Sequence, residues 1–586
     1  MLRVNPKGFW SFLSDKKEIR DLPSVMQLDE DTSSDEREIS NLFAKNFVSA
    51  YSSEIIVPPQ IDYDHHVQID HNNVIFSEDI VYKALSKLSG RAASGVDEIS
   101  SFYIKKCSLH LSKPLTLLFN RSLQSGEFPD RWKVALIKPI YKSGSKNSIK
   151  NYRPVSIISI IPKLFEKLVY DRINVILNPL IIDKQFGFMK QRSTVTNLTS
   201  FHHFVTNALH TGCQVDCVYT DFSRAFDRVN HNMLISKLFA LGVSGYLLKW
   251  IHSFLSGRVQ IVKVGNALSE PINVSSGCIQ GGHMSGLLFL LFINDIADII
   301  PSDVGYWLFA DDLKFAVRVR GGEDVALVQE VLSRLYHWCS SNFMELNIKK
   351  CSIMTYHRKK SPLLATYNIN GEVLARREQV SDLGVTFEKD LRFVTHIQNV
   401  RAKASRMLGF ITRNTKDFSN VSTLRTLYFA YVRSVLEYCS VVWSPQYQVH
   451  IKSLESIQHK FLRLIAFKSN TRIENHDYAE IESANNIMAL ETRRQINDLV
   501  FLYKLINNKH FCPDLLSQIN IKVPTRETRN KVLFGLKKYK TNIDNNAPLQ
   551  RSQRYWNLAS DGGVDIFSDS VLNIIRLVES HILPFH

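Results

Sequence analysis

Residues 307–317 read WLFADDLKFAV, which places two adjacent aspartates inside an otherwise apolar run. Two apolar segments separated by such a short polar step predict a β-hairpin tipped by Asp311 and Asp312, because aspartate tolerates turn geometry. The pair can be a simple turn, or its carboxylates can hold a divalent metal ion. The metal interpretation requires a third acidic residue elsewhere and an anionic substrate for the metal to serve.

The composition is that of a globular protein whose surface suits a polyanion. The chain has 586 residues, 45% of them hydrophobic, which is enough for about three or four domains. Lys and Arg number 72 against 56 Asp and Glu, a net charge of +16, interleaved with 21 Tyr and 34 Phe. This balance favours nucleic acid over an anionic membrane. The first residues show no signal-peptide core or other targeting signal, and the longest apolar run, 286–293, is too short to span a bilayer. We therefore expect a soluble, intracellular protein, nuclear or cytoplasmic, with no membrane partner.

Eight cysteines are scattered without any Cys-x-x-Cys pair, so neither a zinc ribbon nor a disulfide framework is supported. His202, His203, His210, Cys213 and Cys217 lie close together in the sequence, but their spacing matches no zinc-ligand pattern. We interpret this group as structural.

Hydrophobic periodicity predicts a mixed α/β half followed by an α-rich half. Charged residues 15–38 indicate a solvated linker, an amphipathic helix follows at 39–47, and a helix begins after a capping Ser77. Predicted strands cover 134–142, 152–160, 214–221, 259–265 and 351–357, the first two forming a basic hairpin. Predicted helices cover 231–241, 247–256, 323–342, 396–413, 421–438, 449–466 and 488–507.

Asp221 is the candidate for the third acidic residue. Residues 215–229 read VDCVYTDFSRAFDRV, a strand-like alternation that stops at Asp221. A strand that ends in an acid beside the Asp311–Asp312 hairpin could hold two Mg²⁺ ions about 3.5–4 Å apart, since Mg²⁺ prefers carboxylate and phosphate oxygens. The alternative is that Asp221 caps a helix over 223–229.

Six stretches of the sequence, taken in the order in which they follow one another along the chain, strengthen the interpretation of the aspartates as metal ligands. They are WKVALIKPIYKSGSKNSIKNYRPVSIISIIPKLFEKLV (132–169), QFGFMKQRSTVTNL (185–198), YTDFSRAFDRVNHNML (219–234), FADD (309–312), LNIKKC (346–351) and SDLGVTFEKDLRF (381–393). Together they resemble the reverse transcriptase of non-LTR (LINE-type) retrotransposons, nearest the jockey-like branch. YVRSVLEYCSVVWSP (431–445) and DLVFLYKLIN (498–507) resemble the thumb and tail of the same elements.

The resemblance implies an α/β (α+β) right-hand polymerase with fingers, a palm of antiparallel sheet with packed helices, a thumb, and an α-rich C-terminal region. The implied parts are an N-terminal linker or extension (1–75), fingers (76–200), palm (201–380), primer grip and thumb (381–470), and a basic C-terminal region (471–586). The family's upstream endonuclease is expected to be lacking.

The resemblance also assigns roles at the site. Asp221 and Asp311 are implied metal ligands together with the main-chain carbonyl of Phe222, with Asp312 in support and Lys350 as proton donor to the leaving pyrophosphate. The implied nucleotide-binding residues are Lys138, Arg153, Phe222, Phe226, Gln280 and Gly281. In this set Lys138 and Arg153 grip the triphosphate, and Phe226 excludes a ribose 2′-hydroxyl. Leu383 and Gly384 hold the primer terminus. Without the resemblance, Phe226 would be a core aromatic residue and Arg153 the partner of a local acid.

The implied activity is that of an RNA-directed DNA polymerase, which extends a DNA 3′-hydroxyl primer on a retrotransposon RNA template. Its substrates are deoxynucleoside triphosphates and its cofactors two Mg²⁺ ions, for which Mn²⁺ can substitute. Residues 521–556 carry nine Lys and Arg against two acids, with Phe534, Tyr539, Tyr555 and Trp556 between them. That mixture suits either nucleic-acid binding with base stacking or a solvated basic face.

Two segments depart from the family. Residues 277–286 read GCIQGGHMSG where the family has Gly-x-Pro-Gln-Gly-Ser-x-x-Gly-Pro, and residues 94–100 read SGVDEIS in place of Gly-Pro-Asp-Gly-Ile-Pro. We expect the changes at 277–286 to loosen the nucleotide pocket and weaken the polymerase. The four substitutions Ile279→Pro, Gly282→Ser, Ser285→Gly and Gly286→Pro, made together, should therefore raise activity. The alternative function is a decayed or co-opted copy that binds RNA without polymerising.

Overall fold

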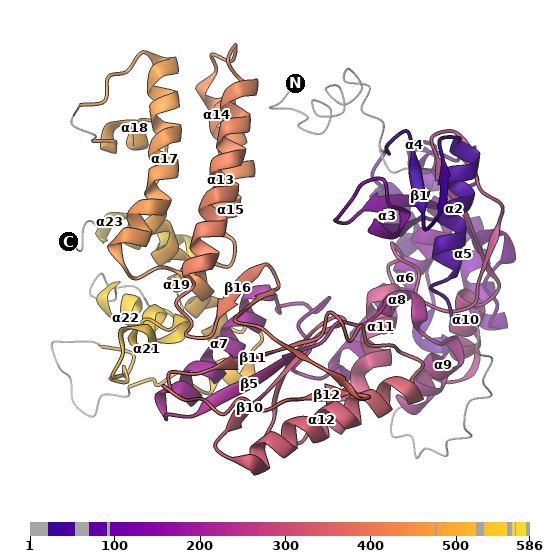
Figure 1. The fold of residues 1–586 in the computed structure, drawn as a ribbon. Coiled ribbons are helices and arrows are strands. Elements are labelled where there is room, and N and C mark those ends of the chain that lie inside the picture. The colour runs from indigo at the N-terminus through magenta and orange to yellow at the C-terminus, as the bar shows by residue number, and fades with distance from the viewer. Residues whose placement is uncertain are drawn as a thin grey trace.

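Figure 1 shows three parts arranged in an arc, with thumb helices on one side, the palm at the base and the fingers on the other side. The structure is a computed structural model that describes residues 22–52, 69–90, 94–474, 477–522, 532–559, 565–568 and 570–581. The arrangement is that of a right-hand polymerase, as the sequence predicts.

The palm is a five-stranded sheet in the order β14-β11-β5-β10-β9. Its central strand β5 (Gln214–Tyr219) pairs antiparallel with both β10 (Asp312–Val319) and β11 (Ser352–Tyr356). The outer strands are β9 (Gly305–Phe309) and β14 (Ala375–Arg376). Alternate β5 residues face opposite cores, with Val218 in the core of helix α12 (Gly322–Ser341) and Cys217 in that of helix α7 (Thr194–His210). The sheet is therefore buried on both faces.

The fingers are built on a second sheet, in the order β4-β3-β6-β7, with β8 paired to β6. The predicted basic hairpin is confirmed, because β3 (Val134–Tyr141) and β4 (Tyr152–Ile157) pair antiparallel. The strands β6 (Arg258–Val264), β7 (Ala267–Leu268) and β8 (Ile272–Val274) come from the middle of the 201–380 segment. Because β6 pairs with β3, the chain returns from the palm to the fingers before it forms the Asp311 hairpin.

The N-terminal segment is packed on the fingers. The expected linker is wrong for residues 22–38, where β1 (Met26–Leu28) and β2 (Asp31–Ser33) form an antiparallel pair with buried Met26 and Leu28. Residues 15–21 lie outside the described residues. Helix α2 (Glu36–Val48) follows, capped by Asp35, and it packs on β6. Ser77 stands at the N-cap of α3 (Glu78–Ser86), as predicted, but its side chain makes no capping hydrogen bond.

The thumb is helical, as the periodicity predicts. Its helices are α13 (Val394–Asn414), α14 (Val421–Tyr428), α15 (Ser434–Glu437) and α17 (Gln448–Ser469), which stand together in Figure 1. The helix predicted over 421–438 is interrupted by a π-helical turn at Phe429–Arg433. Helix α19 (Leu490–Ile506) lies at the thumb's base and contacts α16 (Ser440–Trp443) and α17.

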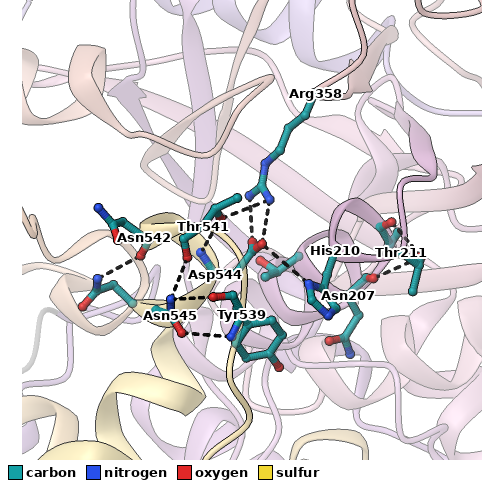
Figure 2. Close-up of polar contacts among 12 residues, drawn as sticks. Asn207, His210, Thr211, Arg358, Tyr539, Thr541, Asn542, Asp544 and Asn545 are labelled. Carbon is teal, nitrogen blue, oxygen red and sulfur yellow. Dashed lines mark hydrogen bonds and ion pairs between the residues drawn. The ribbon is translucent and has the colours of Figure 1, made fainter.

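The C-terminal region docks on the palm through an ion pair between an exposed arginine and a buried aspartate (Figure 2). Arg358, two residues after β11, donates two hydrogen bonds of 2.7 Å to Asp544, whose side chain is only 1% exposed. His210 of α7 meets the ring of Tyr539 edge-on, 4.6 Å between centroids. On the thumb side, Arg551 of α22 (Pro548–Ala559) pairs with Asp498 and donates to the Val441 carbonyl. Residues 541–551 therefore tie the palm to the base of the thumb.

Burial removes two of the four aromatic residues, Phe534 and Trp556, from the base-stacking interpretation of the stretch 521–556, whereas Tyr539 and Tyr555 are half-buried. Phe534 and Trp556 lie in the core, and Arg551 forms a buried ion pair with Asp498. The basic side chains of this stretch that the structure shows exposed are Lys522, Lys537, Lys538 and Lys540, whereas 523–531 lie outside the described residues. Within the described ranges, no helix is long and apolar enough to cross a membrane.

Candidate active site

Asp311 lies at the tip of the β9–β10 hairpin, as the sequence predicts. Phe309 pairs with Asp312, so Ala310 and Asp311 form the turn, and Ala310 has a positive φ of 57°. The turn is clamped from outside by Gln185, which is 1% exposed: its Oε1 accepts from the Ala310 N–H at 2.8 Å. This clamp aims the aspartates and was missed from the sequence.

Gly187 explains why the segment after Gln185 can approach so closely. A Cβ at Gly187 would lie 2.4 Å from the Ala310 nitrogen, so a side chain there would push the turn away. The Phe186 N–H also donates to the Leu308 carbonyl at 2.8 Å. The QFG sequence at 185–187 is therefore a support for the hairpin tip.

Asp221 lies just beyond β5, the strand next to β10. Its carbonyl accepts from the Asn347 N–H at 2.7 Å, and Phe222 forms a bridge with Leu346. In this antiparallel pairing the N–H and C=O of Phe222 point away from Leu346 and toward the β10 side, where Asp311 lies. Asp221 does not cap the following helix α8 (Ala225–Arg228), whose N-cap position is Arg224. The helix-cap alternative is therefore wrong.

The aspartates concentrate negative charge at one place. Burial raises the pKa of Asp311, and the nearby Asp221 carboxylate raises it further. The pKa of Asp312 is raised to about 6 by loss of solvent and then by Asp311, Asp382 and Asp221, although the residue keeps access to water at the start of β10. Such mutual repulsion is what a bound cation would relieve.

The possible metal ligands are two carboxylates and one main-chain carbonyl. Mg²⁺ prefers such hard oxygen donors and takes further ligands from water or phosphate, so the donor set of Asp221, Asp311 and Phe222 fits it. Among the described residues, no three His, Cys, Asp or Glu side chains form a group that could hold a metal by themselves. The Nζ of Lys350 lies 3.2 Å from the Oδ2 of Asp221.

A basic surface faces the aspartates from the fingers. Lys138 pairs with Val155 and Ile140 with Arg153, so Lys138, Lys142 and Arg153 share the exposed face of the β3–β4 hairpin. Arg153 and Lys142 both lower the pKa of Asp311, so their charges lie within electrostatic reach of it. Lys142 was not assigned from the sequence, although it follows Lys138 by four residues and therefore points to the same side.

Phe226 lies on α8 directly after the Asp221 strand. Its ring stacks on Phe289 at 4.1 Å with an angle of 18° between planes, and Phe188 meets it edge-on at 6.0 Å. Phe289 belongs to α11 (Ser285–Ile293). Phe226 is half-buried, so packing on the core fixes its ring while part of the residue remains open to solvent.

Gln280 and Gly281 pack against the strand that carries Arg153. The Ser156 N–H donates to the Gln280 carbonyl at 2.8 Å, and Gly281 has a positive φ of 115°. A Cβ at Gly281 would lie 2.8 Å from the Ser156 carbonyl oxygen, so only glycine allows this approach. The Gln-Gly pair is therefore brought together with Arg153 and Phe226.

Leu383 and Gly384 form the turn between β15 (Gln379–Asp382) and β16 (Val385–Glu388), both with positive φ. The Tyr438 hydroxyl donates to the Leu383 carbonyl at 2.9 Å, which ties this hairpin to the thumb. A pocket of about 430 Å³ separates the hairpin from the aspartates and is lined by Asp221 and Asp312 as well as Leu383. The turn therefore borders the same pocket as Asp221 and Asp312.

The segment 277–286 is packed rather than loosened. A Cβ at Gly282 would lie 2.5 Å from Oε1 of Glu166, a buried side chain of α6 (Ile160–Leu177) that also accepts from the Met284 N–H at 2.8 Å. The Ser285 hydroxyl donates to the Ile279 carbonyl. The expectation of a loose loop is wrong, because Glu166 and Ser285 occupy the space and satisfy the polar groups.

Comparison with known proteins identifies the fold that carries this site. Residues 140–410 match the family described as reverse transcriptase (RNA-dependent DNA polymerase). Residues 140–410 are a reverse transcriptase domain. The reverse transcriptase expected from the sequence is thereby confirmed over these residues, and the match begins at the fingers hairpin and ends in the first thumb helix, α13.

Several relatives of this reverse transcriptase domain are named as polymerases of mobile elements in Drosophila melanogaster. The "Probable RNA-directed DNA polymerase from transposon BS" is 28% identical over 66% of this chain and 44% of its own length. The polymerase from transposon X-element is 28% identical over 68% of this chain and 45% of its own length. The "RNA-directed DNA polymerase from mobile element jockey" is 26% identical over 66% and 43%. The chain therefore spans less than half the length of these relatives.

Among solved structures, the apo telomerase from Candida Tropicalis truncated from its C-terminal domain is matched over 44% of this chain and 54% of that chain. The sequence identity is 13% and the TM-score 0.29, which is too low to bear on the fold.

Proposed function

We propose that this chain is an RNA-directed DNA polymerase that adds deoxynucleotides to a DNA 3′-hydroxyl primer on a retrotransposon RNA template. The observation that carries the proposal is the meeting of Asp311, at a hairpin tip, with Asp221, at the end of the neighbouring strand. A reverse transcriptase domain over 140–410 and relatives named as RNA-directed DNA polymerases support it.

Asp221, Asp311 and the Phe222 carbonyl would hold Mg²⁺, for which Mn²⁺ is expected to substitute. Two such ions would lower the pKa of the primer 3′-hydroxyl and stabilise charge on the leaving pyrophosphate. Lys350 is proposed to donate a proton to that pyrophosphate, since its Nζ already lies 3.2 Å from Asp221 Oδ2.

The fingers would bind the triphosphate of the incoming nucleotide. Arg153 offers a planar, bidentate group for phosphate oxygens, and Lys138 and Lys142 add charge on the same face. Gln280 and Gly281 would form the wall against β4, and the ring of Phe226 would exclude a 2′-hydroxyl. Leu383 and Gly384 are proposed to hold the primer terminus across the pocket that reaches Asp312.

The implied partners are an RNA template, a DNA primer or target, and deoxynucleoside triphosphates. The net charge of +16 suits the two nucleic acids. These partners would place the protein inside the cell, in the nucleus or the cytoplasm.

A second candidate is an RNA-binding copy that no longer polymerises. It rests on the altered segment 277–286, and the close packing of Gly282 on Glu166 weakens that ground. Intact Asp221, Asp311 and Arg153 favour the polymerase.

Primer extension separates the two candidates. Asp311→Asn should reduce Mg²⁺-dependent extension of a DNA primer on RNA by about 100-fold or more, since it removes charge at the reaction centre. Its affinity for the RNA–DNA hybrid should stay within a few-fold of the parent's. Asp303→Asn is the matched control, because Asp303 is exposed two residues before β9, at the opposite end of the same hairpin. Hybrid binding without extension by the parent would favour the RNA-binding candidate, and extension by Asp311→Asn at the parent rate would refute the metal assignment.

A further inference from the structure

Gln280 is held at two points by segments from different parts of the hand. Its main-chain carbonyl accepts from the Ser156 N–H of β4. Its side-chain Nε2 donates to Asp227 Oδ1 at 2.7 Å. Asp227 lies on α8, one residue after Phe226, so the hydrogen bond joins the two proposed walls of the nucleotide pocket.

The main chain around this hydrogen bond leaves little room for adjustment. The Cys278 N–H donates to the Phe226 carbonyl at 2.8 Å, and the Ser276 hydroxyl to the Asp227 carbonyl at 2.7 Å. Gly277 has a positive φ of 96°, and a Cβ there would lie 2.8 Å from the Asp227 Cα. The loop 276–280 is therefore laid directly on the turn that carries Phe226.

The carboxylate of Asp227 is held away from solvent among polar groups. Burial raises its pKa to about 6, whereas the Gln280 hydrogen bond, Arg224 and Arg153 act in the opposite direction. A small cavity of about 20 Å³ next to it is lined also by Tyr51, Gln260 and Arg258, large enough for about one water molecule. The Gln280 amide is therefore a close partner of this carboxylate in a place largely shielded from solvent.

The N-terminal segment supports the same turn from behind. Arg224 donates to the Asn46 carbonyl at 3.0 Å and to the Ser49 hydroxyl at 3.1 Å. The Tyr51 hydroxyl donates to Gln260 at 2.6 Å, and the Ser52 N–H donates to the Ser276 hydroxyl at 2.8 Å. These contacts fix the main chain of the loop and of the turn. They do not fix the orientation of the Gln280 side chain.

We propose that Asp227 is a positioning residue of the nucleotide pocket, which fixes the amide of Gln280. An ionised carboxylate accepts hydrogen bonds only, so it must face the Nε2 of Gln280. The Oε1 and the second N–H of that amide are then presented to the pocket in one orientation. The inference rests on the proposed polymerase function and names the group that would hold one wall of its site.

Single-nucleotide incorporation tests this role through a double-mutant cycle. The variants are Asp227→Ala, Gln280→Ala and the two together, with Asp303→Ala as the control. Without Asp227 the Gln280 amide would be misplaced relative to the nucleotide, and such misplacement is costly. We therefore expect Asp227→Ala to raise the KM for the deoxynucleotide about tenfold and to leave the Kd for the primer–template unchanged. If Asp227 acts through Gln280, the double variant should be no worse than Gln280→Ala alone.

The conservative variant Asp227→Asn keeps the shape of the side chain and supplies a second measurement if the alanine variant does not fold. Asparagine can still accept from Gln280 through its Oδ1, but it does not titrate. Its KM should stay within a few-fold of the parent's at pH 8, because the hydrogen bond that holds the Gln280 amide is kept.

Additive effects of Asp227→Ala and Gln280→Ala would overturn the inference, as would a parent-like KM in Asp227→Ala. A parent that does not extend the primer would overturn the proposed function, and this inference with it. An active parent with additive variants would overturn this inference alone.

Discussion

Gly282→Ser should lower both the stability and the activity of the protein, although serine is the family's residue at this position. Gly282 has no positive φ, so the backbone itself accepts a side chain. The obstacle is Glu166, whose Oε1 would lie 2.5 Å from the new Cβ. Glu166 is 1% exposed, so its carboxylate cannot swing into water, and moving it breaks the 2.8 Å hydrogen bond from the Met284 N–H.

The size of the effect follows from that hydrogen bond. A buried donor that is left without its hydrogen-bond partner costs about 1–3 kcal/mol. At about 1.4 kcal/mol per factor of ten, the intact loop would become about 10- to 100-fold less populated relative to displaced arrangements. Because this loop carries Gln280, the loss should appear in nucleotide incorporation as well as in stability.

The assay compares denaturant midpoints and kcat/KM for one deoxynucleotide. Gly321→Ser is the matched control, because a Cβ at Gly321 meets nothing within 4 Å. In a Glu166→Ala background, Gly282→Ser should cost less than it does alone, since the obstructing carboxylate is gone. A Gly282→Ser protein with unchanged stability and higher activity would refute the packing argument and restore the view that the segment has merely drifted.

Three further outcomes are expected. Phe226→Val should raise the ratio of ribonucleotide to deoxynucleotide kcat/KM, because the ring edge that would block a 2′-hydroxyl is lost; an unchanged ratio would make Phe226 a core residue only. Arg358→Ala leaves the buried Asp544 carboxylate without its partner, at a cost of about 1–3 kcal/mol, and should make the C-terminal region sensitive to limited proteolysis, whereas removing both side chains should restore much of the resistance. The pKa of buried His202 is lowered to about 3, so the unfolded chain binds a proton that the folded chain does not. Stability should therefore fall by about 1.4 kcal/mol per pH unit from this group as pH drops below about 6.5, and His202→Gln should flatten that slope in denaturant titrations.

The elements that hold the aspartates could be predicted because their signals are local. Apolar alternation ends at Asp221 and flanks Asp311, so the strand, the hairpin and their acidic tips follow from period and turn chemistry. The β3–β4 hairpin follows in the same way. Lys142 could have been added to it, since strand alternation places it on the face of Lys138.

The contacts that fix the site could not be predicted, because they join distant segments through single side chains. Gln185 reaches Ala310 across 125 positions, and Gln280 reaches Asp227 across 53. Such hydrogen bonds leave no periodicity in the sequence. The same holds for Glu166 and Gly282. The glycine is required there because Glu166, a residue far away in the sequence, fills the space that a side chain would need.

The site also depends on residues outside the matched domain of 140–410. Arg224, next to the Phe226 turn, is held by Asn46 and Ser49, and Arg358 after β11 is neutralised by Asp544. A fragment limited to 140–410 would leave both arginines without these partners and would uncover the face of β6 on which α2 packs. Because loss of a buried partner is costly while loss of a surface one is not, the Arg358 pair should matter for docking the C-terminal region. The Arg224 contacts should matter for nucleotide incorporation, since they brace the turn between Asp221 and Asp227. Segments on both sides of the matched domain therefore support the proposed site, one packed behind the Phe226 turn and one at the base of the thumb.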